Sequence, residues 1–220
     1  MKTREKTTKK QVKAIAIIND IDKDLIHDYR RLKKVSSDSS KYPQNLNTIK
    51  KITTFIHGNI KSIEDKLVKA IIIRSNGFGS DPVNTKSKII YKPSNPYSKL
   101  KHIKEYKNRM KNTTILSKDW KYIVHKYDSK TTLFYLDPPY ENTDAGIYDN
   151  NIIDYHEMRN ILHNIKGKFL LSINGSSNIR NIFRDFRIRK LKLKTISRLK
   201  RKEVLISNFK ITNFKYDIYV

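Results

Sequence analysis

The hydrophobic positions of the chain fall into two patterns. One is a short, unbroken apolar run bounded by polar residues, which is typical of a strand buried on both faces of a sheet. Strict alternation of apolar and polar residues, at 214–220, instead predicts a half-exposed strand. The other predicted strands lie at 12–20, 113–120, 132–136, 168–174, 190–194 and 203–209.

The second pattern is helical spacing between these runs, with apolar residues three or four positions apart. A long stripe extends from Thr48 to about Ile73, and His57-Gly58 divides it into two helices. The inward stripe of the first predicted helix consists of Ile21, Leu25, Tyr29 and Leu32. Further helices are predicted to begin at Lys99, Asp154 and Ser177.

Strands separated by helices predict an α/β fold, with a mostly parallel sheet covered by helices on both faces. Residues 1–11 form a basic tail, and we assign 12–34 and 99–220 to the α/β core. Residues 35–98 are then a helical and loop insertion. Its last part, 74–98, has no predicted element, and a long segment of that kind is usually functional or disordered.

The net charge of the chain indicates the kind of partner that it binds. The chain of 220 residues has 47 Lys and Arg against 21 Asp and Glu, a formal net charge of +26. Such an excess favours a polyanionic partner and nucleic acid first, although a lysine-rich coding bias would also produce it. Residues 187–202 predict a strand with one basic face, for which a solvated surface and phosphate contact are both open. The candidate nucleic-acid contacts are Arg74, Arg187, Arg189, Lys190, Lys192, Arg198, Lys200 and Arg201.

The composition also disfavours several classes of protein. The chain has no cysteine, which excludes disulfides and thiolate metal sites. Its 6 histidines are scattered without ligand spacing, so we expect no structural metal. No apolar run approaches the roughly 20 residues that span a bilayer, and no signal-peptide core follows the basic amino terminus. We therefore expect an intracellular, non-secreted chain with no membrane partner.

The most informative stretch is the apolar run that stops at Asp137-Pro138-Pro139-Tyr140. Two prolines fix φ and remove two backbone donors, so neither a strand nor a helix continues through them. Asp137 and Tyr140 are therefore presented on a stiff turn at the carboxyl end of a buried strand, where open α/β sheets bind ligands. The simpler interpretation is a rigid turn with no further role.

A planar base with an exocyclic amine suits such a turn. The Asp137 carboxylate and a proline carbonyl beside it would each accept a hydrogen bond from the amine, which draws its nitrogen toward a tetrahedral shape and frees the lone pair. Tyr140 would stack on the base, as enzymes that extrude a base require. A lone pair held against an electrophilic methyl group needs positioning more than acid–base chemistry.

Residues 12–209 resemble the adenine-specific DNA methyltransferases of the D12 class. The segment "AIINDIDKDLIHDYRRLKK" looks like the family's second motif, and "IRSNGFGS" is similar to its asparagine-arginine and Gly-Phe-x-Gly segment. "SKDW" resembles the motif that holds the cofactor's adenine, DPPY the catalytic motif, and "GKFLLSINGSSNIRNIF" and "EVLISNF" the later strands. DPPY alone also marks methyltransferases that act on cytosine or glutamine, so the colinear set carries the resemblance.

The resemblance implies a Rossmann-like class I methyltransferase sheet, DNA-recognition helices in the insertion, and S-adenosylmethionine as cofactor. Asp20, or alternatively Asp22, would hold the cofactor's ribose, and Asp119 with Trp120 its adenine. Residues 137–140, which are Asp, Pro, Pro and Tyr, would be catalytic. Each has a simpler interpretation, since Asp20 suits a helix N-cap and Trp120 suits a core.

Two family segments are missing from the sequence: the opening strand with its glycine-rich turn, and an upstream lysine segment that also contacts the cofactor. The family opens with a strand and a Pro-Phe-x-Gly-x-Gly-like turn around the cofactor's methionine part, whereas this sequence begins only eleven residues before the second motif. In the family's sheet that strand lies between those ending at Asp20 and Asp137, so its loss leaves two edges with unpaired backbone groups. A partner chain donates it, or the sheet closes directly without cofactor, or an upstream piece of the gene product is absent.

Two functions are therefore expected as rivals. The first is transfer of a methyl group from S-adenosylmethionine to adenine of DNA, or alternatively of RNA, with weak or partner-dependent cofactor binding. The second is an inactive pseudo-methyltransferase that serves as a basic nucleic-acid-binding or structural subunit of a larger assembly.

Overall fold

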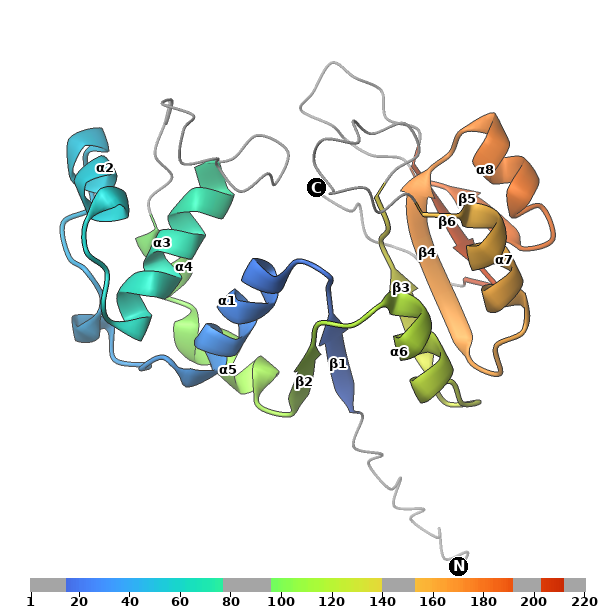
Figure 1. The fold of residues 1–220 in the computed structure, drawn as a ribbon, viewed down its shortest axis with the longest axis horizontal. Coiled ribbons are helices and arrows are strands. Elements are labelled where there is room, and N and C mark those ends of the chain that lie inside the picture. Colours follow the sequence, from blue (N-terminus) through green and yellow to red (C-terminus); the bar gives the residue numbers. More distant parts are fainter. Residues whose placement is uncertain (1–14, 77–95, 140–152, 192–202, 212–220) are drawn as a thin grey trace, which may run out of the picture. The chain divides into compact units, whose positions relative to one another are not determined.

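The structure, a computed structural model, describes residues 15–76, 96–139, 153–191 and 203–211. These residues form two compact units that divide between Asp119 and Trp120, and each is described by itself (Figure 1). Several predictions fall outside the described residues: the basic tail, most of the Gly-Phe-x-Gly segment, the strand at 214–220, Tyr140, Lys192, Arg198, Lys200 and Arg201.

The first unit contains a pair of parallel strands, β1 (Ala16–Asn19) and β2 (Thr113–Leu116). Ala16 is in register with Thr113 and Asn19 with Leu116, so both strands end at the same edge. The residues that follow them, Asp20 and 117–119, therefore leave the sheet at one place.

The helices of the first unit surround a core of their own. They are α1 (Lys23–Lys34), η1 (Ser39–Lys41), α2 (Ile49–His57), α3 (Ile63–Asn76), α4 (Tyr97–Leu100) and α5 (Ile103–Met110). The predicted break at His57-Gly58 is confirmed, because α2 ends at His57 and Gly58 is its C-cap. The core consists of Val35, Tyr42, Leu46, Ile52, Ile56, Leu67, Val68, Ile72, Leu100 and Ile103. It includes residues beyond 98, and the assignment of 35–98 as an insertion stays a prediction.

The predicted inward stripe of the first helix is wrong at one end. Ile21 lies before the helix and is 56% exposed, because the N-cap is Asp22 and the helical turns begin only at Lys23. The fully buried position of α1 is Ile26, one residue away from the predicted Leu25.

The described residues of the second unit form a four-stranded sheet with three helices. Its sheet order is β3-β4-β6-β5, with β3 parallel to β4, and β6 antiparallel to both of its neighbours. The elements are α6 (Trp120–Tyr127), β3 (Leu133–Leu136), α7 (Tyr155–His163), β4 (Lys168–Asn174), α8 (Ser177–Ile182), β5 (Arg187–Lys190) and β6 (Glu203–Ser207). Helix α6 was not predicted, and β5 begins three residues before the predicted strand at 190–194.

The three helices pack against one face of this sheet. Their buried residues share a cluster with the inward residues of the strands: Val124, Phe134, Met158, Leu162, Phe169, Leu171, Ile173, Ile179, Ile182, Phe183, Val204 and Ile206. On the opposite face of β3, Leu133 and Tyr135 are 60% and 63% exposed. An apolar edge strand with such a face is suited to a further contact.

The α/β class is confirmed, but the sheet differs from the prediction. The described strands form two small sheets, and the larger one has two antiparallel pairings against one parallel pairing, so it is not mostly parallel. Strand direction depends on partners far along the chain, which the apolar runs do not encode. No helix in the described ranges is both long and apolar enough to cross a bilayer.

Candidate functional site

Asp137 directly follows β3, at the carboxyl end of the strand. Because β3 and β4 are parallel and in register from Leu133 and Lys168 onward, Asp137 and the last residue of β4, Asn174, share one edge of the sheet. The prolines do end the strand as predicted, and Pro138 is buried while Pro139 is half-buried.

The turn after Asp137 is held from the neighbouring helix. The hydroxyl of Tyr155, the first residue of α7, donates a hydrogen bond of 2.5 Å to the carbonyl oxygen of Pro139. Helix α7 is itself fixed at that end, because Asp154 caps it and accepts hydrogen bonds from the amides of His156 and Glu157. The rigidity of the turn thus comes from α7 as well as from the prolines.

The environment of Asp137 disfavours its charged form. Desolvation raises the pKa of the Asp137 carboxyl above its usual range, and the negative charge of Glu203 raises it further. Asp137 is nevertheless an exposed residue, so a ligand can reach it although its pKa is raised. Glu203 is only 7% exposed, and it is in antiparallel register with Asn174.

The predicted cofactor residues Asp20 and Asp119 lie beyond the carboxyl ends of β1 and β2. The side chain of Asn19 joins these ends: its Nδ2 donates to the carbonyl of Lys118, and its Oδ1 accepts from the amide of Lys118, each at 2.9 Å. This pair of hydrogen bonds continues the ladder of the two strands by one step. Asp20 and Asp119 are therefore held on adjoining segments of the first unit.

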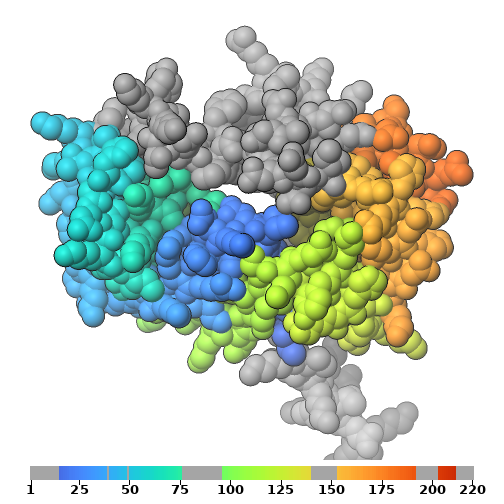
Figure 2. All heavy atoms as spheres, viewed as in Figure 1, coloured from blue at the N-terminus to red at the C-terminus, as the bar shows by residue number. Residues whose placement is uncertain are grey.

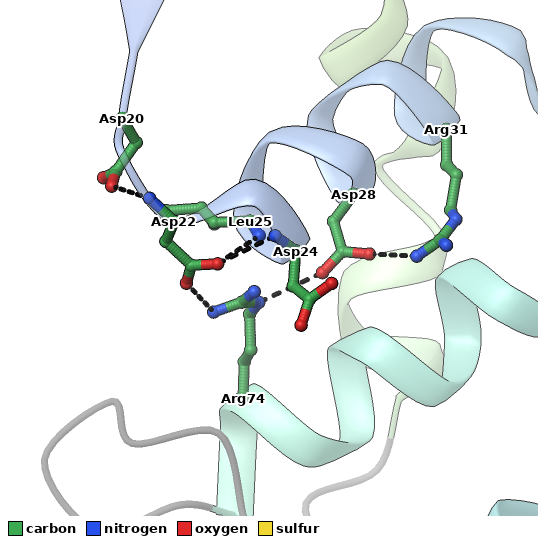
Figure 3. A network of polar contacts seen from close by, with 7 residues as sticks. All are labelled: Asp20, Asp22, Asp24, Leu25, Asp28, Arg31 and Arg74. Carbon is green, nitrogen blue, oxygen red and sulfur yellow. Dashed lines mark hydrogen bonds and ion pairs between the residues drawn. The ribbon is translucent and has the colours of Figure 1, made fainter. Parts of the chain in front are cut away.

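Of the two residues predicted for the ribose contact, Asp20 is more available than Asp22. The Asp22 carboxylate caps α1, accepting from the amides of Asp24 and Leu25, and it also lies 3.6 Å from Arg74 (Figure 3). Asp20 is not the N-cap, although its Oδ1 accepts from the amide of Asp22 at 2.9 Å. Within the described part of the chain, the Asp20 carboxylate therefore has fewer partners than that of Asp22.

Arg74, a predicted nucleic-acid contact, is engaged inside the first unit. Its Nε lies 3.1 Å from the Asp28 carboxylate, which also pairs with Arg31, so it links α3 to α1 (Figure 3). A guanidinium has five donors, and a quarter of this side chain remains exposed. Phosphate contact by Arg74 stays a prediction and would compete with these ion pairs.

The remaining predicted residues lie in the second unit. Trp120 is half-buried and packs against the core of that unit, as expected from the simpler interpretation of this residue as part of a core. Arg187, Arg189 and Lys190 are exposed on β5, an edge strand whose Ile188 packs inward. The described part of 187–202 thus forms a strand with a basic outer face.

A separate pocket of about 310 Å³ lies between α6 and α7. Atoms of both helices are visible on the face of the molecule drawn in Figure 2. The lining of the pocket includes Val124, His125, Asp128 and Glu157, and none of the predicted site residues. No group of three or more potential metal ligands occurs in the described ranges.

Three residues near these sites were not singled out from the sequence: Asn19, Tyr155 and Glu203. Glu203 did carry a signal, because it is a single acid that opens the apolar run "EVLIS". Asn19 and Tyr155 act through contacts with segments distant in the sequence, and no local pattern reveals such contacts.

Two comparisons with known proteins bear on this arrangement. Residues 6–196 match the model of the D12 class N6 adenine-specific DNA methyltransferase family. The type II methyltransferase M.CviBI of Paramecium bursaria Chlorella virus NC1A is 32% identical over 81 residues, which are 36% of this chain and 31% of that protein. The chain thus covers less than a third of the length of this relative.

Proposed function

The chain belongs to the D12 class N6 adenine-specific DNA methyltransferase family, and from that premise we propose that it transfers the methyl group of S-adenosylmethionine to the exocyclic amine of adenine in DNA. The observation that carries the proposal is the position of Asp137, an exposed residue with a carboxylate acceptor on a proline turn at the end of β3. Tyr155 holds this turn through the Pro139 carbonyl.

The proposed chemistry follows from the acceptors on the turn. Asp137 and the carbonyl of Pro138 each accept a hydrogen bond from the amine, while the Pro139 carbonyl is already engaged by Tyr155. The amine lone pair attacks the methyl carbon, the carbon–sulfur bond breaks, and the nitrogen then releases a proton to Asp137. Tyr140 is proposed to stack on the extruded base.

The residues of the first unit fit part of the cofactor. Bound S-adenosylmethionine would supply an electrophilic methyl group on a positively charged sulfur. Asp20 is an acceptor suited to the ribose hydroxyls, and Asp119 is one suited to the adenine amine. The Asn19 contacts with Lys118 keep the two carboxylates on linked segments. Trp120 is proposed as the adjoining apolar wall.

We also propose that a partner chain completes the sheet and strengthens cofactor binding. Among the described strands, β3 pairs only with β4, and β1 pairs only with β2. The sequence of β3, "LFYL", has no charge or proline to protect its free edge, as edge strands ordinarily do. A strand added to this edge would satisfy its backbone groups, and the partner would supply the glycine-rich turn and form a Rossmann-like sheet.

The test is a methyl-transfer assay with labelled S-adenosylmethionine and adenine-containing DNA. It compares the pure chain, the chain with any co-purifying partner, and two variants of the assembly. Asp137→Ala should lose at least about 100-fold in kcat, since it removes a positioned acceptor. Asp185→Ala, a surface acid paired with Arg159, should leave the rate within about two-fold.

Each outcome has a separate meaning. Methyl transfer by the pure chain at the rate of the assembly would refute the need for a partner. No transfer by the assembly, with DNA or RNA, would refute the enzyme. A rate that is unchanged in Asp137→Ala would refute the role of the turn.

A second candidate is a basic, inactive subunit that binds nucleic acid, and the exposed cations on β5 favour it. In that case Asp137→Ala leaves the biological role intact, whereas replacing Arg187, Arg189 and Lys190 by glutamine abolishes nucleic-acid binding. Binding at several salt concentrations measures the contribution of these charges, because phosphate contacts weaken as salt rises.

A further inference from the structure

Three residues with hydrogen-bond acceptors lie at the same end of the second unit's sheet: Asp137, Asn174 and Glu203. Asp137 follows β3, Asn174 ends the parallel strand β4, and Glu203 opens the antiparallel strand β6 in register with Asn174. We call these three residues the acidic corner. A buried carboxylate at the start of an apolar strand is unusual, because Glu is almost never fully buried unless it is paired.

The described residues give the acidic corner few donors. Glu203 is 7% exposed, and no ion pair to its carboxylate occurs in the described part of the chain. The Oδ1 of Asn174 is buried and has no hydrogen-bond partner among the residues that the structure describes. An unpaired buried acceptor such as the Asn174 Oδ1 is costly, so a site that retains it is suited to a ligand that brings a donor.

We propose, building on the proposed amine site, that Glu203 is a positioning residue that acts through Asp137: its buried negative charge lies at the same end of the sheet as the Asp137 carboxylate and favours the positive charge that develops on the substrate nitrogen. As the new nitrogen–carbon bond forms and the carbon–sulfur bond breaks, the amine carries a positive charge until one proton passes to Asp137. Asn174 adds an oxygen dipole of the same sign at the same edge.

Among the described residues, the charged groups on the neighbouring elements do not cancel this effect. Glu203 is the charged residue that raises the pKa of Asp137, after desolvation. On α8, Arg180 directs its Nε to the carbonyl of Gly175 at 3.0 Å. On β5, Lys190 pairs with Val204 and is exposed. A base with a higher pKa holds the amine proton more strongly, so Glu203 makes Asp137 a better acceptor.

The first test follows the ionisation of Asp137 and needs no activity. The carboxyl carbons of aspartate are labelled in the full chain and titrated by NMR, with Asp137→Asn to assign the signal. Glu203→Gln removes the charge but keeps the shape, so the Asp137 titration should move to lower pH, while the part of the shift that desolvation causes remains. Glu203→Asp, which keeps the charge, should restore most of the shift.

Glu157→Gln on α7 is the matched control, because Glu157 pairs with Lys121 and does not act on the pKa of Asp137. Its Asp137 titration should equal that of the wild type. An unchanged titration in Glu203→Gln, or an equal change in Glu157→Gln, overturns the proposal. Circular dichroism establishes that each variant is folded before it is titrated.

The second test uses the active assembly and the pH dependence of methyl transfer. Glu203→Gln should lower kcat by about ten-fold with little change in KM for DNA, since the charge acts on the developing cation rather than on binding. The acidic limb of its pH profile should move to lower pH, because Asp137 then ionises more readily. If methyl transfer is absent altogether, the proposed function fails, while the NMR titration still decides the role of Glu203.

Discussion

A close backbone approach at Gly167, in the second unit, gives a prediction independent of function. Gly167, between α7 and β4, has no room for a side chain. A Cβ there would lie 2.8 Å from the carbonyl oxygens of both Ser129 and Thr132, and 3.3 Å from Oδ1 of Asp128. Carbon and oxygen atoms ordinarily stay well above 3 Å apart, so replacement by alanine forces the backbone to move.

Neither carbonyl can move freely, because the loop before β3 is tied to the segment before β4. Thr132 accepts a 2.8 Å hydrogen bond from the amide of Lys168, and Asp128 accepts from the amides of Lys166 and Gly167. Relieving the overlap lengthens at least one of these bonds. Overpacking costs about 1–3 kcal/mol and a weakened hydrogen bond about 1 kcal/mol. Alanine returns about 0.5–1 kcal/mol by restricting the unfolded chain.

We therefore expect Gly167→Ala to lower the free energy of unfolding by about 2–3 kcal/mol. Urea denaturation measures it through the fluorescence of Trp120, the single tryptophan, which packs against the core of the same unit. Gly58→Ala is the control, since its Cβ would meet Thr54 O at 3.1 Å and Phe55 O at 3.5 Å. It should change stability by less than about 1 kcal/mol. A loss under about 0.5 kcal/mol in Gly167→Ala would refute the steric reasoning.

Three further predictions concern the sites. Tyr155→Phe removes only the hydroxyl that holds Pro139, and methyl transfer should lose about ten-fold in kcat with the fold intact; an unchanged rate contradicts this. Asn19→Ala removes both hydrogen bonds to Lys118, and calorimetry should show binding of S-adenosylmethionine weakened by about ten-fold, because about 1.4 kcal/mol lies within the net contribution of two hydrogen bonds. The backbone hydrogen bond from Glu157 lowers the pKa of Asp154 below 3.8, so its stabilisation is complete above that value and is lost as pH falls through the folded pKa. In acid unfolding followed by circular dichroism, Asp154→Ala should lose less stability than the wild type as pH falls below 3.8.

The features that the sequence predicted well depend on neighbours in the chain. The end of β3 at Asp137 follows from two prolines, the break at Gly58 from a glycine, and the start of α7 from the capping side chain of Asp154. Each is settled within a few residues, so periodicity and turn chemistry suffice.

The features that were missed depend on distant partners. Ile21 continues a helical stripe in the sequence, but Asp22 caps the helix after it and leaves it exposed. The direction of β6 is set by its pairing with β4, some thirty residues earlier in the chain, with Leu171 opposite Ile206. Apolar runs of either direction look alike, which explains the incorrect expectation of a mostly parallel sheet.

Glu203 is also a residue whose role depends on distant partners, because its environment is set by the pairing of β6 with β4. On a solvated strand it would be an ordinary surface acid; in antiparallel register with Asn174, it is a buried charge near a second carboxylate. Two like charges close together destabilise a fold, and sequences retain such conflicts chiefly at functional sites. Because Asp137 has a raised pKa, its ionisation weakens the folded state as pH rises above 3.8 and onward through the folded value. The same repulsion that costs stability makes Asp137 receptive to a donor, which is what an amine substrate provides.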